Sequence, residues 1–142
     1  MKFYVAGASA EWQRARRVMD ELEKFGHYIT YDWTESFAEG ANNSVLSLNQ
    51  AIAFSSADQD AVARADVLLL LVPSDGLFTT GAWTELGVMR ECIRRGETRE
   101  IWIVGSWKKN IFMSTADRMF DDDVEMLADA KKYLPVWAEG LV

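Results

Sequence analysis

A single carboxylate, Glu85, stands in the segment 81–87, which follows an apolar run and a polar loop. The segment is typical of a loop that enters a helix, and it places Glu85 in the expected first helical turn. Free N–H groups and a partial positive charge at a helix N-terminus favour an ionised carboxylate. Beyond the carboxyl end of a buried strand, such a carboxylate can attack an electrophilic carbon. The alternative is an acidic residue that only favours the start of a helix.

Further acidic and aromatic side chains flank that strand and could complete a site. Asp58 precedes the strand, and Asp75 follows it in a Pro-Ser-Asp-Gly turn, where a turn-forming role is the alternative. Tyr4 lies in the first apolar run, and a buried tyrosine hydroxyl needs a partner that a nearby carboxylate would supply. His27 opens a predicted strand, and we expect it to be structural.

Several common site chemistries have no signature in this chain. The turn Gly7-Ala8-Ser9 lacks the full glycine pattern of dinucleotide binding, and a Walker-type loop is missing. One cysteine, Cys92, allows no internal disulfide, and no cluster of His and Cys suits zinc. We therefore expect that the protein needs neither a metal nor an organic cofactor.

The composition predicts one ordered globular domain that spans residues 1–142, because the chain is 49% hydrophobic and 26% charged. The formal charge of -7 argues against a nucleic-acid polymer or an anionic membrane as partner. A nucleoside or nucleotide needs only a few local donors and stays possible. The first residues form a strand-like run without signal-peptide features, and no run reaches membrane-spanning length, which predicts a cytoplasmic protein.

Hydrophobic patterns of strand and helix alternate along the whole chain. Strands are predicted at residues 2–6, 27–33, 66–72, 100–104 and 118–120. Helices are predicted at residues 12–25 with Ser9 as the cap, 44–64, 82–95, and from 121–123 to 134, with a polar loop or flap at 34–43. This alternation predicts an α/β fold, a flavodoxin-like or Rossmann-like three-layer sandwich around a mostly parallel sheet of about five strands.

Ligands of such sheets bind outside the carboxyl ends of the strands. Four segments should meet there, at residues 7–9, 32–34, 73–81 and 105–110. Each brings small or polar residues directly after an apolar run, as a binding site requires.

The order and spacing of several short motifs resemble the nucleoside 2-deoxyribosyltransferase family and the related 2'-deoxynucleoside 5'-monophosphate N-hydrolases. The resemblance covers residues 2 to about 112. Its motifs are Phe3-Tyr4-Val5-Ala6-Gly7-Ala8, Gly26-His27, Asp58 eight residues before Ala65-Asp66, the segment 81–87, and Asn110-Ile111-Phe112-Met113. The loop 73–85 is longer than in the hydrolases, and residues 32–33 and 37–54 match neither class closely.

The resemblance implies an enzyme that cleaves the N-glycosidic bond of 2'-deoxynucleosides through a covalent glycosyl-glutamate intermediate, with net retention. Glu85 matches the nucleophile, Tyr4 the tyrosine that orients it, and Asp58 an acidic residue of the pocket. Asp75 corresponds to an aspartate that protonates or holds the leaving base. The sugar then passes to another nucleobase or to water.

Other substrate contacts are expected from the loops at the same edge of the sheet. The expected substrate-binding residues are Gly7, Ser9, Trp33, Ser74, Asp75, Gly81 and Asn110. Asn110 resembles an asparagine donated across a subunit interface, which implies a homo-oligomer of at least two chains. Ser9, Arg14 and Ser74 fall where the hydrolases hold a 5'-phosphate, and Trp33 or Trp83 could stack on a base.

Three functions stay open at this point. The first is a transferase that acts on a 2'-deoxynucleoside and a free nucleobase. The second is a hydrolase of 2'-deoxynucleoside 5'-monophosphates. The third is a non-catalytic module of the same fold that binds or senses nucleotides.

Overall fold

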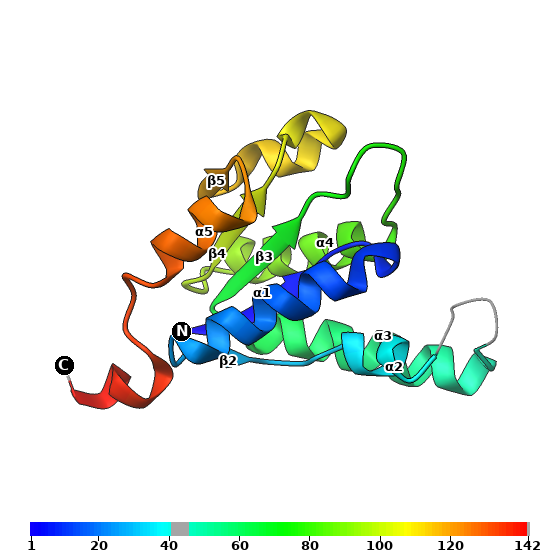
Figure 1. The fold of residues 1–142 in the computed structure, drawn as a ribbon, viewed down its shortest axis with the longest axis horizontal. Helices are drawn as coiled ribbons and strands as arrows, with labels where there is room; N and C mark the ends of the chain where they lie inside the picture. The colour runs from blue at the N-terminus through cyan, green and yellow to red at the C-terminus, as the bar shows by residue number, and fades with distance from the viewer. Residues whose placement is uncertain (41–45, 142) are drawn as a thin grey trace.

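The computed structural model describes residues 1–40 and 46–141, with a five-stranded parallel sheet between two layers of helices (Figure 1). The strands are β1 Lys2–Ala6, β2 Tyr28–Ile29, β3 Val67–Leu71, β4 Glu100–Val104 and β5 Arg118–Phe120. Their order in the sheet is β2-β1-β3-β4-β5, and all four pairings are parallel. The predicted α/β fold class is confirmed.

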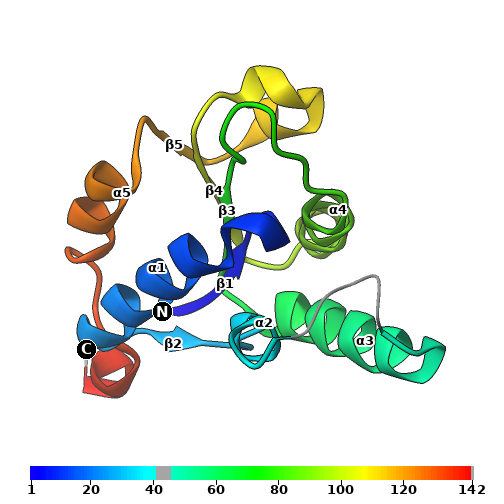
Figure 2. The ribbon, with the colours of Figure 1, turned by 45° about the vertical axis from the view of Figure 1, so that its right-hand side comes forward.

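Helices cover both faces of the sheet. They are α1 Trp12–Lys24, α2 Thr34–Ala38, α3 Leu48–Arg64, α4 Gly81–Arg94 and α5 Asp123–Ala130, with 3₁₀ turns η1 Ser9–Glu11, η3 Trp107–Lys109, η4 Ile111–Thr115 and η5 Val136–Leu141. Helices α3 and α4 pack on one face and α1 and α5 on the other, as Figure 2 shows. Among the described residues, no helix is both long enough and apolar enough to cross a membrane.

The central strand β3 is buried along its whole length, which explains its continuous apolar sequence. Leu68 and Leu70 belong to the core under α3 and α4. Leu69 and Leu71 belong to the core under α1 and α5. Alternation along one strand therefore supplies both layers of the core.

The segment after α1 differs from its prediction. Instead of a strand over residues 27–33, only Tyr28 and Ile29 pair with β1. Asp32 then accepts a hydrogen bond from the Thr34 backbone N–H at 2.9 Å, and this turn starts α2 where a polar loop was predicted. The rest of that predicted loop, residues 41–43, and the predicted helix start at residues 44–45 lie outside the described residues.

Two predicted helix ends also differ. Ser9 caps nothing, because it is the first residue of η1, whose own N-cap is Ala8 without a side-chain hydrogen bond. Helix α5 ends at Ala130 rather than at residue 134, and Asp122 caps its start by accepting from the Glu125 N–H at 2.8 Å. His27, which was predicted to be structural, is buried, with its Nε2 2.9 Å from the Ala130 carbonyl oxygen and its Nδ1 2.9 Å from the N-terminal amine.

The strand order creates a crevice between β1 and β3. From β1 the chain crosses to β2 on one side, and from β2 it returns past β1 to β3 on the other. Loops that leave the carboxyl ends of β1 and β3 therefore diverge, and such a switch point is where open parallel sheets bind ligands.

Candidate active site

A cavity of about 260 Å³ lies at the switch point. It is lined by Tyr4, Gly7, Ser9, Tyr31, Trp33, Ser36, Phe37, Leu46, Phe54, Asp58, Phe78, Thr79, Thr80, Gly81, Ala82 and Glu85. These residues come from β1, from the segments that follow β1, β2 and β3, and from helices α2, α3 and α4. The cavity therefore combines aromatic walls with two carboxyl groups.

Three of the predicted site residues meet inside this cavity. Tyr4 from β1 is 1% exposed, and its hydroxyl lies close enough to the carboxyl groups of Asp58 from α3 and Glu85 from α4 to lower the pKa of each. One oxygen of each carboxyl group, Asp58 Oδ1 and Glu85 Oε2, is buried without a hydrogen-bond partner among the described residues. Buried carboxyl oxygens without partners are costly, and they are available to a ligand.

Burial controls the protonation of this pair. It raises the pKa of Glu85 to about 8, and the neighbouring Asp58 raises it further, while the hydrogen bond with Tyr4 opposes the rise. Burial likewise raises the pKa of Asp58 to about 6, again opposed by Tyr4. The pKa of Tyr4 is raised by burial and by both carboxylates, so its hydroxyl stays protonated. Between about pH 6 and pH 8 the two carboxyl groups together hold about one proton.

The prediction that a helix N-terminus keeps Glu85 ionised is wrong. Helix α4 begins at Gly81 and has no acidic residue in its first turn, so Glu85 lies in the second turn. The effect of the helix dipole falls off within one turn, whereas removal from water penalises the charged form directly.

Two glycines and a tryptophan that were predicted as substrate contacts also line the cavity. A Cβ added to Gly81 would lie 3.6 Å from Glu85 Oε1, so the glycine leaves room beside that carboxyl group. A Cβ added to Gly7 would lie 3.7 Å from the Leu71 Cβ. Trp33 donates from Nε1 to the Val5 carbonyl at 2.7 Å, which fixes its ring in the cavity wall. Ser9 completes this group of predicted residues in the lining.

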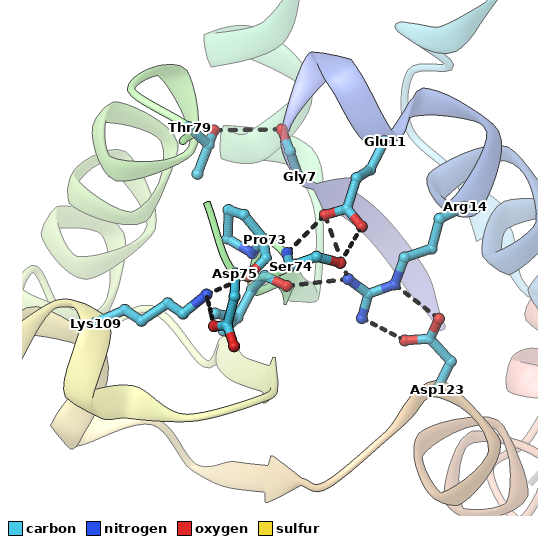
Figure 3. Close-up of polar contacts among 10 residues, drawn as sticks. Gly7, Glu11, Arg14, Pro73, Ser74, Asp75, Thr79, Lys109 and Asp123 are labelled. Carbon is cyan, nitrogen blue, oxygen red and sulfur yellow. Dashed lines mark hydrogen bonds and ion pairs between the residues drawn. The ribbon is translucent and has the colours of Figure 1, made fainter. Parts of the chain in front are cut away.

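Three other predicted contacts are not part of the described lining of this cavity. Ser74 donates from its N–H and hydroxyl to the Glu11 carboxylate at 3.0 and 2.6 Å (Figure 3). Asp75 has a fully exposed side chain that pairs with Lys109 at 3.3 Å beside a second cavity of about 320 Å³. Asn110 accepts from the Phe112 N–H at 3.0 Å and thereby caps η4.

Arg14 is likewise engaged in the fold. It donates from Nε and Nη2 to Asp123 at 2.8 Å each, and from Nη1 to the Val72 carbonyl at 3.0 Å (Figure 3). The pKa of Arg14 is raised chiefly by this bond to Asp123. The guanidinium therefore joins α1, α5 and the end of β3, and a 5'-phosphate would have to compete with Asp123 for it.

Apart from Trp33, the aromatic residues in the wall of the cavity were not predicted. Tyr31, Phe37, Phe54 and Phe78 lie in segments whose patterns indicated a strand, a loop, a helix and a turn. Spacing could have found one of them, because Phe54 and Asp58 are four residues apart and share one face of α3. The described part of the chain contains no group of three or more His, Cys, Asp or Glu residues that could hold a metal ion.

Comparison with known proteins gives a likeness of fold. No protein-family model matches the chain, and no curated protein matches it. A CMP N-glycosidase of Clostridium botulinum, BcmB, superposes with a TM-score of 0.54 at 17% identity, over 94% of this chain and 100% of that chain. A conserved protein from Enterococcus faecalis V583 superposes with a TM-score of 0.57 at 16% identity, over 93% and 98%. The chain therefore has the α/β fold that is found in a CMP N-glycosidase.

Proposed function

We propose that this protein cleaves the N-glycosidic bond of 2'-deoxynucleosides and transfers the deoxyribosyl group to another nucleobase. The observation that carries the proposal is the buried pair Asp58 and Glu85 on one tyrosine hydroxyl in an aromatic-walled cavity. Two carboxyl groups are what glycosidic cleavage requires, one as nucleophile and one as acid. The motif resemblance and the fold shared with a CMP N-glycosidase support the same reaction class.

In the first step the Glu85 carboxylate attacks the anomeric carbon of the sugar. A carbon–oxygen bond forms, the bond from that carbon to the base nitrogen breaks, and its electron pair goes to the base. Asp58 gives its proton to the base, because a nucleobase anion leaves poorly. Asp75 is not needed for this role, since it lies outside the described lining of the cavity.

The starting protonation state follows from the shared hydroxyl. The pair holds about one proton near neutral pH, mainly on Glu85, whose pKa is the higher of the two. The reactive state is the one in which that proton has moved to Asp58. The Tyr4 hydroxyl lies beside both groups, so it can relay the proton from Glu85 to Asp58. The Tyr4 hydroxyl can then donate to ionised Glu85 and hold that carboxylate in place.

In the second step an acceptor base attacks the same anomeric carbon. The ester bond to Glu85 breaks, its electron pair returns to the carboxylate, and Asp58 takes the proton that the acceptor base loses. Two displacements at one carbon give net retention. If water replaces the base, the same steps give hydrolysis.

The electrostatics of the cavity favour a nucleoside over a nucleotide. Its described lining contains two acidic side chains and no Lys, Arg or His. A 5'-phosphate in that lining would meet like charge, which is unfavourable at short range. A hydrolase of 5'-monophosphates is the second candidate, because Ser9 lies in the lining and the fold neighbour is a CMP N-glycosidase.

The test is a chromatographic assay of base release from the four 2'-deoxynucleosides and their 5'-monophosphates, with and without a second base. Glu85→Ala should abolish release, and Glu91→Gln on the exposed face of the same helix should not change it. Products that need an acceptor base support the transferase, and release without one indicates a hydrolase. Folded protein that acts on no substrate would overturn the proposal and leave a binding module.

We also propose that the active protein is a homo-oligomer to which Asn110 contributes across the interface, as the resemblance implies. In one chain Asn110 lies outside the described lining, and the neighbouring Ile111 and Phe112 are 71% and 69% exposed. Sedimentation of the purified protein tests this, since a monomer with full activity would contradict it.

A further inference from the structure

Phe78 is a large aromatic residue that the fold leaves in solvent. It is 87% exposed, and it lines both the cavity that holds Glu85 and the second cavity beside Lys109. It therefore stands at the border between the two cavities. Exposed apolar surface beside a cavity is typical of a site that becomes covered when a ligand binds.

The loop that carries Phe78 is fixed at its base. The Val72 carbonyl accepts from Arg14, the Pro73 carbonyl accepts from Lys109, and Ser74 donates to Glu11 (Figure 3). Three consecutive residues are thus held by side chains from outside the loop. Contacts with the rest of the fold therefore fix the point at which the exposed part of the loop begins.

The far end of the same loop is also anchored. Thr79 donates its hydroxyl to the Gly7 carbonyl at 3.4 Å (Figure 3). The same hydroxyl accepts from the Ala82 N–H at the start of α4. Between the anchors the backbone turns at Gly76, whose φ of +83° lies in the left-handed region. Phe78 is therefore presented next to an anchored residue, so that ordering it against a ligand costs little conformational entropy.

The rest of the cavity offers surfaces for stacking and few groups that could identify a base by its edge. Trp33, Phe37 and Phe54 stand in the lining, and Trp33 is fixed both by its bond to Val5 and by an edge-to-face contact with Phe37. The described lining contains no Asn, Gln, Lys, Arg or His side chain. Every nucleobase has a π-face, whereas its edges differ.

We propose that Phe78 contacts the substrate and covers the exposed face of the nucleobase in the cavity. The inference rests on the proposed function in taking the ligand to be a nucleobase. Because the contact is to a ring face, Phe78 should strengthen the binding of purines and pyrimidines by similar factors.

The experiment is isothermal titration of the full chain with free adenine and free cytosine as probes. Phe78→Ala should weaken both by about tenfold or more, the range for loss of one stacked aromatic ring. Phe78→Tyr should restore binding to within about threefold of the wild type. Trp137→Ala is the matched control, because Trp137 is a similarly exposed aromatic residue that is absent from both cavities, and it should leave both affinities unchanged.

The outcomes separate this inference from the proposed function. Bases that bind wild type and Phe78→Ala equally well would overturn the role of Phe78, even if base release is observed. Weaker binding in Phe78→Ala that comes with a change in sedimentation would assign Phe78 to an interface between copies and overturn its role as well. Stacking-dependent binding without base release from any nucleoside would support Phe78 and refute the enzyme.

Discussion

Asp58 on α3 and Glu85 on α4 both approach the hydroxyl of Tyr4 on β1, and this hydroxyl lowers the pKa of each carboxyl group. Burial raises the pKa of both carboxyl groups, and Glu85 is affected more strongly than Asp58. The proposed roles need one group ionised and the other protonated. Near neutral pH the pair holds about one proton, and the higher pKa of Glu85 places it mainly there, so the proposed roles require that proton to pass to Asp58 before Glu85 can attack.

The pH dependence of base release should be bell-shaped. Below about pH 6 both carboxyl groups are protonated and the nucleophile is lost, and above about pH 8 both are ionised and the acid is lost. We expect kcat/KM to fall on both sides of an optimum near pH 7, measured by initial rates between pH 5 and pH 9. A rate that stays constant over this range would show that the two groups do not take part.

Tyr4→Phe should move this profile to higher pH. The hydroxyl lowers the pKa of both carboxyl groups, so its removal leaves burial unopposed. We expect kcat to fall by about tenfold or more, because the nucleophile loses its orienting donor. Tyr31→Phe is the control, since Tyr31 also lines the cavity but makes no hydrogen bond that lowers the pKa of Glu85. An unchanged acidic limb in Tyr4→Phe would contradict the shared hydroxyl.

Glu85→Gln should stabilise the fold at alkaline pH. The pKa of Glu85 in the folded state is raised above its ordinary value, so the folded state binds the extra proton and loses stability as pH rises through about 8. The glutamine variant does not lose stability in this way. We expect the two proteins to unfold alike at pH 4, and the variant to be more stable by on the order of 2 kcal/mol at pH 9. Urea unfolding at both pH values measures this, and equal stability at pH 9 would contradict it.

Arg14→Ala should lower the stability of the fold without a selective effect on 5'-monophosphates as substrates. The variant loses a paired guanidinium and the donor to Val72, so we expect a loss of about 1–3 kcal/mol in the free energy of unfolding. Arg94→Ala, on an exposed pair with Glu91, is the control and should leave the stability nearly unchanged. KM for nucleosides and for monophosphates should change by the same factor in Arg14→Ala. A selective rise for monophosphates would favour the hydrolase.

Local sequence patterns predict most of the fold. Strands β4 and β5 occupy the predicted residues 100–104 and 118–120, because short apolar runs next to polar turns define them. The segment 27–33 does not follow its pattern. Its aromatic residues favour a strand, but Tyr31 and Trp33 line the cavity instead, and the bond from Thr34 to Asp32 begins a helix. Packing around the cavity therefore outweighs the β-propensity of this segment.

The site was less accessible to prediction than the fold. Tyr4, Asp58 and Glu85 are far apart in sequence, and only the resemblance to a known family predicts that they share one site. Their protonation could not be derived, since burial of Glu85 depends on the packing of α3 against α4 and not on its place near a helix start. The resemblance assigned Ser74 and Asp75 to the substrate site by their position in a loop. Their side chains instead bind Glu11 and Lys109, which are distant in the chain.

The strand order has a consequence for the order of folding. Strand β1 pairs with β2 on one side and with β3 on the other. The middle of the sheet therefore cannot form until residues 67–71 have paired with β1. Parallel pairings between distant segments pay loop-closure entropy before they gain contacts, which makes them slow steps. During refolding, the cavity should therefore form when the sheet is completed, and later than the individual helices.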